Sequence, residues 1–478
     1  MKKTMKPYIS TLFAAALFAG RAIAGSPTTP PPKEPVPTPL LSFADGKVVF
    51  DIEERLRWEM LDNAFDFNKG KNAITDTNVL QQRFRIGMML KPADWFRIYV
   101  QAQDSREFFG NRPEVPGASG AEGNDSFDLR QAYIEISDYS KCPWGLKLGR
   151  QELIYGDERL VGAFDWNNFG RTFDAAKLTY KKPGFTLDMF SATPVVITNN
   201  NFDQSDLFNG DEQNRGLVFS GIYASLNDLP FGTADLYTFM VDQARGNTSN
   251  AQGTLAAAVN AGSGSLKAHS DFATIGTRIK GDPKKLNGWE FGTELAYQVG
   301  DVRGLTLNAF AATVGAGFNF DAPWKPRLYA EYNYASGDSN SGDKKVGTFQ
   351  NLFPTNHPFY GIMDTFSWQN LQNAMVSFRV APLKDVTMQV DYNAFWLADT
   401  NDTWYRANGL TAVRPLNAAA KSAGDYCGSE VDFIVKWKVN RFLSVQGGYS
   451  HFIAGDYLKS TGFSSDANFA YMQATIKF

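Results

Sequence analysis

Apolar and polar residues alternate with a period of two through most of the chain from Gly46 onward. Successive side chains of a β-strand point to opposite faces of a sheet, so this pattern predicts strands. In residues 48–58 one face is apolar apart from Glu54 and holds Val48, Phe50, Ile52, Leu56 and Trp58. The opposite face is mostly charged and holds Val49, Asp51, Glu53, Arg55 and Arg57.

The next two segments repeat this pattern and predict a hairpin. Residues 81–90 set Phe84 and Ile86 against Arg83 and Arg85, and residues 96–103 alternate in the same way after a turn at residues 91–94. Further alternating segments span residues 289–299, 327–334, 388–396, 431–437 and 443–449. We count about eighteen such segments, and an even number is expected of a single-chain bacterial outer-membrane barrel.

The connections between the segments fall into two classes. Short ones contain Pro, Gly or Asn, as at residues 182–184, 381–383 and 439–441. Long ones are polar and rich in Gly, Asp and Asn, and they span residues 109–124, 199–215, 245–267, 338–357 and 401–424. Short periplasmic turns alternating with long extracellular loops are typical of outer-membrane barrels.

A soluble β-sandwich would also alternate, but a chain of 478 residues would then divide into domains, and no boundary is visible. Aromatic residues make up 14% of the chain while the mean hydropathy is only −0.30. No apolar run reaches the roughly 20 residues of a spanning helix, which leaves closed strands as the way to satisfy backbone groups in lipid. The sequence therefore predicts an all-β, transmembrane antiparallel barrel of about eighteen strands.

The two ends of the chain indicate the compartment. Three lysines, an apolar run at residues 9–19 and Ala22-Ile23-Ala24 predict a signal peptide at residues 1–24, cleaved before Gly25. An uncleaved anchor is the alternative, and the run is short for one. Residues 25–45 form a Pro-rich periplasmic lead-in, and residues 46–478 form the barrel. The last segment ends in Phe478, which resembles the assembly signal of outer-membrane barrels, so we expect the barrel assembly machinery, outer-membrane lipid and lipopolysaccharide as partners.

Charge and composition narrow the remaining partners. The net charge is −3 and falls further without the basic signal peptide, which argues against nucleic acid. Cys142 and Cys427 are far apart in sequence, and export permits a disulfide between them without requiring one. Three histidines, His269, His357 and His451, do not have ligand spacing, so we expect no metal and no cofactor.

Six segments of the chain together form a recognisable pattern. They are Leu129-Arg130-Gln131-Ala132-Tyr133, residues 149–162, Asp165-Trp166-Asn167-Asn168, residues 170–175, residues 352–357 and Phe359-Tyr360-Gly361. Together they resemble the alginate export family of outer-membrane barrels. The resemblance implies a monomeric, eighteen-stranded barrel that passes an anionic polysaccharide through an arginine-lined lumen, with Arg130 and Arg150 at the matching positions. This chain departs from a dedicated polyuronate exporter because its inward faces mix acids with bases, so other small or sugar-like solutes stay open.

Arginines on the polar faces of the first three strands would form a ladder on one wall of the lumen. They are Arg55, Arg57, Arg83, Arg85 and Arg97. Guanidinium groups match carboxylates in geometry, so the ladder would attract acidic solutes. The alternative is that these arginines pair with inward acids such as Asp51 and Glu53 and brace the wall.

A second group of charges is concentrated in eighteen residues, with Gly156, Gly162 and Gly170 as bends. It consists of Asp157, Glu158, Arg159, Asp165, Arg171 and Asp174. The cluster could fold inward as a constriction that sets selectivity. Equally, it could be a salt-bridge network that stabilises a turn between strands.

We predict a passive outer-membrane channel for anionic or sugar-like solutes, with a polyuronate among them. One alternative is a phospholipase-type barrel enzyme, which needs a Ser and a His on one external face; Ser450 and His451 are adjacent on a predicted strand and would face opposite ways. Another is a receptor that captures ligand with its long loops. His357 is expected to pack within a loop.

Overall fold

The computed structural model describes residues 41–70, 75–110, 124–197, 202–205, 216–243, 269–409, 412–414 and 416–478. The chain from Pro39 to Phe478 forms one compact unit. The predicted signal peptide and most of the predicted lead-in lie outside the described residues. So do most of the predicted loops at residues 109–124, 199–215 and 245–267.

Eighteen long strands make up the wall of a barrel in the described part of the chain. They are β2 (Val48–Asp62), β3 (Thr77–Ala93), β4 (Phe96–Phe108), β5 (Asp125–Ser137), β6 (Trp144–Gln151), β7 (Phe173–Lys182), β8 (Phe185–Val196), β10 (Leu217–Leu229), β11 (Gly232–Gln243), β12 (Ser270–Gly281), β13 (Trp289–Val302), β14 (Leu305–Asn319), β15 (Arg327–Ala335), β17 (Leu371–Leu383), β18 (Val386–Leu397), β19 (Tyr426–Lys438), β20 (Leu443–Ala454) and β21 (Ala467–Lys477). The short elements are β1 (Ser42–Phe43), β9 (Gln204–Ser205), β16 (Lys345–Val346), α1 (Ala418–Ser422) and α2 (Asp456–Thr461).

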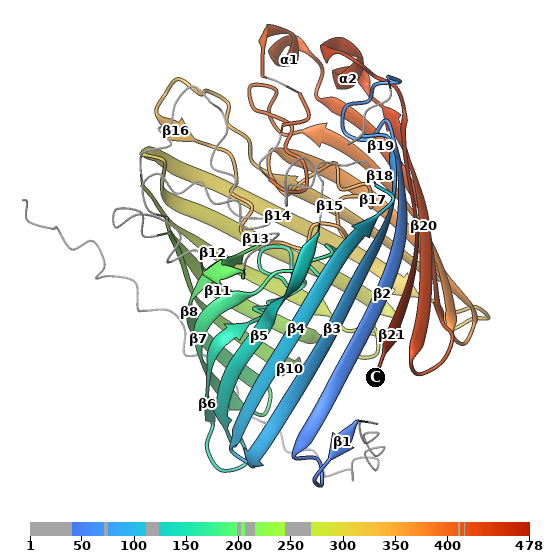
Figure 1. The fold of residues 1–478 in the computed structure, drawn as a ribbon. Helices are drawn as coiled ribbons and strands as arrows, with labels where there is room; N and C mark the ends of the chain where they lie inside the picture. Colours follow the sequence, from blue (N-terminus) through green and yellow to red (C-terminus); the bar gives the residue numbers. More distant parts are fainter. Residues whose placement is uncertain are drawn as a thin grey trace, which may run out of the picture. The chain divides into compact units, whose positions relative to one another are not determined.

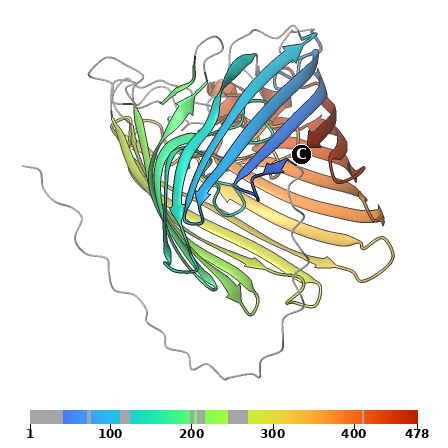
Figure 2. The same ribbon diagram turned by 60° about the horizontal axis from the view of Figure 1, so that its bottom comes forward.

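The wall is antiparallel throughout and closes on itself. Each long strand pairs with the next long strand along the chain, and β2 pairs with β21 from Glu53 opposite Lys477 to Asp62 opposite Asn468 (Figures 1 and 2). Closure removes both edges of the sheet, so every strand has a partner on each side. The predicted all-β antiparallel barrel is confirmed. Among the described residues no helix is long and apolar enough to cross a membrane.

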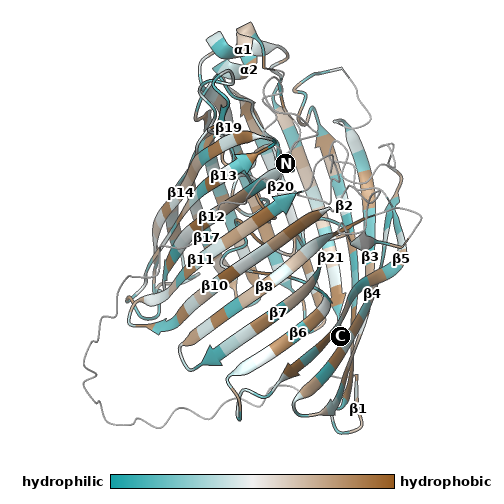
Figure 3. Ribbon diagram, turned by 90° about the vertical axis from the view of Figure 1, so that its left-hand side faces the viewer, coloured by the Kyte–Doolittle hydropathy of each residue, from teal (hydrophilic) through white to brown (hydrophobic). Residues whose placement is uncertain are grey.

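Apolar and polar residues alternate along the strands of the wall, which Figure 3 shows as changing colour along each ribbon. In β14, Val314 faces outward and is 59% exposed, whereas the neighbouring Thr313 faces the interior and is buried. Exposed tryptophans gather near the short turns at one end of the wall, at Trp95, Trp289 and Trp324. Such an aromatic girdle marks the interface between lipid and water.

The short turns lie at one end of the barrel, and the cysteines lie at opposite ends. Cys142 is exposed in the turn between β5 and β6, and Cys427 is buried near the start of β19, beside the long connections. Both thiols are free. The disulfide that the export signal permitted therefore does not form, because the length of the barrel separates the two side chains.

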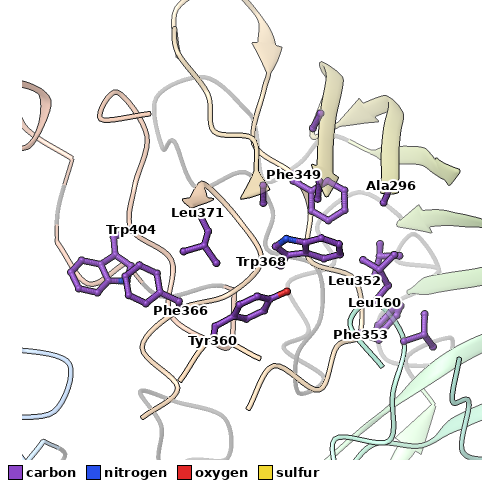
Figure 4. Packing of buried hydrophobic residues seen from close by; sticks show 14 of the residues in the cluster. Leu160, Ala296, Phe349, Leu352, Phe353, Tyr360, Phe366, Trp368, Leu371 and Trp404 are labelled. Atoms are coloured by element: carbon purple, nitrogen blue, oxygen red, sulfur yellow. The ribbon is translucent and has the colours of Figure 1, made fainter. Parts of the chain in front are cut away.

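The apolar core lies inside the barrel and is built largely by three long connections that fold inward. We name them inner loop 1 (residues 152–172, between β6 and β7), inner loop 2 (residues 336–370, between β15 and β17) and inner loop 3 (residues 398–425, between β18 and β19). Figure 4 shows how Leu160 of inner loop 1, Phe353 and Trp368 of inner loop 2 and Trp404 of inner loop 3 pack in one region. Inner loops 1 and 2 thereby bury enough apolar surface to hold a fixed position in the lumen, whereas the part of inner loop 3 that carries α1 lies at the rim of the wall (Figure 1).

Candidate functional site

Inner loop 1 turns into the lumen where β6 ends and returns to the wall at β7. Gly156 and Gly170 adopt positive φ angles of 59° and 75°, a conformation that favours glycine and lets the chain reverse. The amide of Gly162 donates to the carbonyl of Phe353 at 2.8 Å, and the amide of Phe353 donates to the carbonyl of Leu160 at 2.7 Å. These bonds join inner loops 1 and 2 through their backbones, so the two loops form one structure across the lumen.

Arginines of β2 and β3 hold one side of inner loop 1. The guanidinium groups of Arg55, Arg57 and Arg83 donate hydrogen bonds of 2.7, 2.5 and 3.0 Å to main-chain carbonyls of residues 165–167. All three side chains are buried under the loop. The predicted ladder forms on the wall, but the loop covers these guanidinium groups. Their hydrogen bonds therefore hold the loop, and the loop separates them from a solute in the lumen.

The carboxylate of Asp165 lies against the same wall. It accepts from Arg85 at 2.8 Å and lies 3.0 Å from a nitrogen of Arg83, which also pairs with Glu53 at 2.5 Å. Burial would raise the pKa of Asp165, but the positive charges of Arg83, Arg85 and Arg55 lower it well below its usual range. The predicted alternative, in which ladder arginines pair with inward acids, matches the contacts of Arg83.

Charged pairs on the opposite wall hold the other side of inner loop 1. Arg159 binds both carboxylate oxygens of Glu331 on β15 at 2.7 Å. Asp157 lies 2.8 Å from Arg278 and 2.5 Å from Lys280, both on β12. Burial would raise the pKa of Asp157, but hydrogen bonds and charge from Arg278 and Lys280 lower it to about 2. Inner loop 1 thus crosses the lumen and is fixed by ion pairs at both walls.

Two further residues of the predicted charge cluster connect the inner loops to each other. Arg171 donates to the carbonyls of Phe353 and Pro354 at 2.6 and 2.9 Å, and burial lowers its pKa to about 9. Glu158 accepts from the hydroxyl of Thr355 at 2.8 Å. These contacts match the predicted structural network, since both side chains use their polar groups within the loops.

Register places Arg150 and Asp174 on the outer face, which differs from the pore-facing position expected of them. Arg150 is paired with Ala132 and Asp174, on the face that also carries Ile134 and Leu148. Their 2.9 Å ion pair sits where β6 ends and β7 begins. The two charges therefore hold the end of a short strand pair together from outside.

Arg130 and Arg97 do face the interior. Arg130 donates to Gln101 at 3.0 Å and to Glu152 at 2.5 Å, and Arg97 lies 3.3 Å from Glu135. Arg130 sits at a bulge between β4 and β5. The bulge turns Arg130 and its neighbour Gln131 toward the same cavity, which simple alternation does not allow.

An open cavity of about 550 Å³ lies between inner loop 1 and the wall formed by β12 to β18. Lys280 and Arg327 line it, and neither was among the predicted site residues. Arg327 binds Glu290 at 2.5 and 3.1 Å, and Phe359 of inner loop 2 contributes an aromatic face. Period-two alternation in β12 and β15 is the signal that places these side chains inside.

The two residues weighed for an enzymatic site face opposite sides of β20. Ser450 is buried and its hydroxyl donates to Glu430 at 3.0 Å, whereas His451 faces the other side of β20 and contacts Asn468 at 2.8 Å. His357 packs against Asp364 within inner loop 2, as expected, and also against Trp166 of inner loop 1. No group of three or more His, Cys, Asp or Glu side chains gathers as a metal site among the residues described.

Comparisons with known proteins agree with the barrel fold. Structures of Pseudomonas aeruginosa outer-membrane proteins share the fold: OccK9 (OpdG) at 12% identity and a TM-score of 0.59, covering 90% of this chain and 98% of that one, and OpdK with vanillate at 13% and 0.54, with the same coverage. At these identities they show the fold alone. The comparison with curated proteins found no match.

The family comparison covers nearly the whole barrel. The model of the alginate export family matches residues 47–472. Family and fold together support an outer-membrane channel. The chain belongs to the alginate export family.

Proposed function

We propose that the protein is a passive, selective channel for acidic or sugar-like solutes, with a polyuronate as the leading candidate. Inner loop 1 narrows the lumen and leaves the 550 Å³ cavity beside it as a polar route. Membership of the alginate export family supports a polysaccharide substrate. The polar side chains that line the cavity support a substrate rich in hydroxyl groups.

The observation that carries this proposal is the pairing of cations with acids along the cavity. Arg327 is held by Glu290, and Lys280 by Asp157. The charge of each cation is therefore already partly neutralised when a solute reaches it. Conduction needs contacts strong enough to admit a solute and weak enough to release it. A row of paired charges and hydrogen-bonding groups gives a polyhydroxylated acid several moderate contacts without one tight site.

The test is single-channel current through the full chain refolded into a planar bilayer. We expect an ohmic current that oligomeric alginate blocks in brief events, whereas dextran of equal length blocks more weakly. Equal block by both glycans would remove the acidic preference. Open current without block by either would contradict a glycan channel, and absence of current would contradict a channel of any kind.

A further inference from the structure

A second cavity, of about 540 Å³, opens at the mouth of the lumen beside the short turns that follow β17 and β19. Register aligns Thr387, Lys436, Gln446 and Gln473 across β18, β19, β20 and β21. Gln473 is in turn paired with Arg57, whose side chain faces the lumen, so the whole row faces inward. The mouth therefore presents amides, a hydroxyl and an ammonium group to the same space.

Positive charge dominates this cavity. Its lining includes five cations and one acid, namely Lys384, Lys436, Lys438, Arg441 and Lys477 with Asp385. Lys477 is held by Glu53 at 2.7 Å. In the part of the chain that the structure describes, no ion pair within 4.0 Å engages Lys384, Lys436, Lys438 or Arg441. These four side chains are exposed, although Arg441 lies 4.5 Å over the ring of Phe442 and the charge of Lys436 acts on Asp391.

The mouth differs in this respect from the interior. Deeper in the lumen Arg83 and Arg159 are each held by an acid, at 2.5 and 2.7 Å, and nearer the short turns Arg327 is held by Glu290 at 2.5 Å. The chain as a whole carries a net charge of −3, whereas the mouth carries an excess of positive charge. A charge excess at an opening raises the local concentration of oppositely charged solutes and their rate of entry.

We propose that this mouth is a loading site for an acidic oligosaccharide that enters from the periplasm. Lys436 and Lys438 would bind carboxylates, and Gln446, Gln473 and Thr387 would bind hydroxyl groups. The volume lies within the range of about 300–1,000 Å³ usual for ligand pockets. The inference rests on the proposed function and adds the residues that would bind the solute first.

The experiment measures block of the single-channel current by an alginate hexamer added to one side at a time. Labelling of the exposed Cys142, in the same class of short turn, with a membrane-impermeant maleimide identifies the periplasmic side. The variant is Lys436→Gln with Lys438→Gln. The matched control is Lys284→Gln with Lys285→Gln, which removes the same charge from the exposed turn between β12 and β13.

We expect faster block from the periplasmic side in the wild type. In the variant the periplasmic on-rate should fall by about threefold to tenfold at low salt, and the difference should shrink at 1 M salt, where charges are screened within about 3 Å. The extracellular on-rate and the control should stay unchanged.

Three results would overturn the loading site. They are an on-rate equal from both sides, an equal loss in the control, or equally strong block by polyglutamate, which would show a general polyanion effect. Alginate that blocks the wild type from either side without any effect of the lysines leaves the proposed function intact and removes only the loading site. Alginate that never blocks removes the proposed function first.

Discussion

The indole ring of Trp166 lies flat against the imidazole ring of His357, with ring centroids 3.7 Å apart and planes 10° from parallel. Trp166 belongs to inner loop 1 and His357 to inner loop 2, so the stack joins the two loops through side chains. Arg57 lies 4.0 Å over the indole, and Asp364 contacts the imidazole at 2.9 Å. The stack therefore ties both loops to the barrel wall at β2.

Replacing His357 with Ala should loosen this link. Aromatic pairs contribute about 0.5–1.5 kcal/mol beyond the area they bury, so transient opening of the loops should become roughly twofold to tenfold more frequent. Open-channel current noise in a planar bilayer measures this frequency. His451→Ala, on the outer face of β20, is the matched control and should leave the noise unchanged; equal noise in both variants would contradict the role of the stack.

Removing Arg83 and Arg85 together should release the β3 side of inner loop 1. Arg83→Ala with Arg85→Ala removes both cations that bind the carboxylate of Asp165 and leaves Glu53 without its 2.5 Å partner. We expect a larger single-channel conductance and a changed anion preference. The double variant Arg97→Ala with Arg106→Ala removes the same charge from β4 without a side-chain contact to the loop. Unchanged conductance and preference in the first variant would rule out the ladder as the loop's support.

The pairing of Asp157 with Arg278 and Lys280 sets a pH window. The pKa of Asp157 is lowered to about 2, from an ordinary value near 3.9, so the pair adds stability above pH 4 that is lost as pH falls from about 4 to 2. The part of the conductance that depends on Asp157 should therefore stay constant from pH 7 to about pH 4 and change below it, whereas Asp402 of inner loop 3, whose pKa burial raises to about 6, titrates separately. Asp157→Asn should show the altered conductance already at pH 7. A transition between pH 5 and 7 that the wild type shows and Asp157→Asn lacks would contradict this assignment.

A charge placed on the outward face of the wall should lower the stability of the barrel in lipid. Val314→Arg should destabilise the barrel by about 2–4 kcal/mol, because a charge near the middle of the bilayer loses its hydration. Gln389→Arg is the control, since Gln389 lines the polar cavity beside Asp391. Urea titrations of folding into lipid vesicles compare the two. Equal losses would mean that Val314 does not contact lipid.

Much of the wall was predictable because alternation is a local property. Residues 48–58 lie within β2, and the predicted hairpin at residues 81–103 corresponds to β3 and β4. The apolar faces need only lipid to bury them, so tertiary contacts do not override the pattern. The shortness of β6, which ends at Gln151, was not predictable, since its extent depends on where inner loop 1 turns inward.

The site was predictable only in part, because its chemistry depends on contacts across the lumen. The inward positions of the ladder arginines follow from alternation within neighbouring strands. The loop that covers Arg55 and Arg57, however, consists of residues more than a hundred positions away in the sequence. The inward position of Arg130 depends on a bulge, which alternation cannot reveal. The outward position of Arg150 follows from the register of β5 and β6.

The pairing of β2 with β21 also bears on how the barrel forms. Asn468 donates to Asp62 at 3.1 Å across a sequence separation of 406 residues, and the hydrogen bonds around it can form only when both ends of the wall meet. Contacts of such long range are slow, because the entropy of a very large loop is lost before they contribute any stability. Until then the chain is an open sheet with two unpaired edges, each a template for aggregation. The seam is thus the last part of the wall to become protected, and the stage before it closes is when the chain most needs a chaperone.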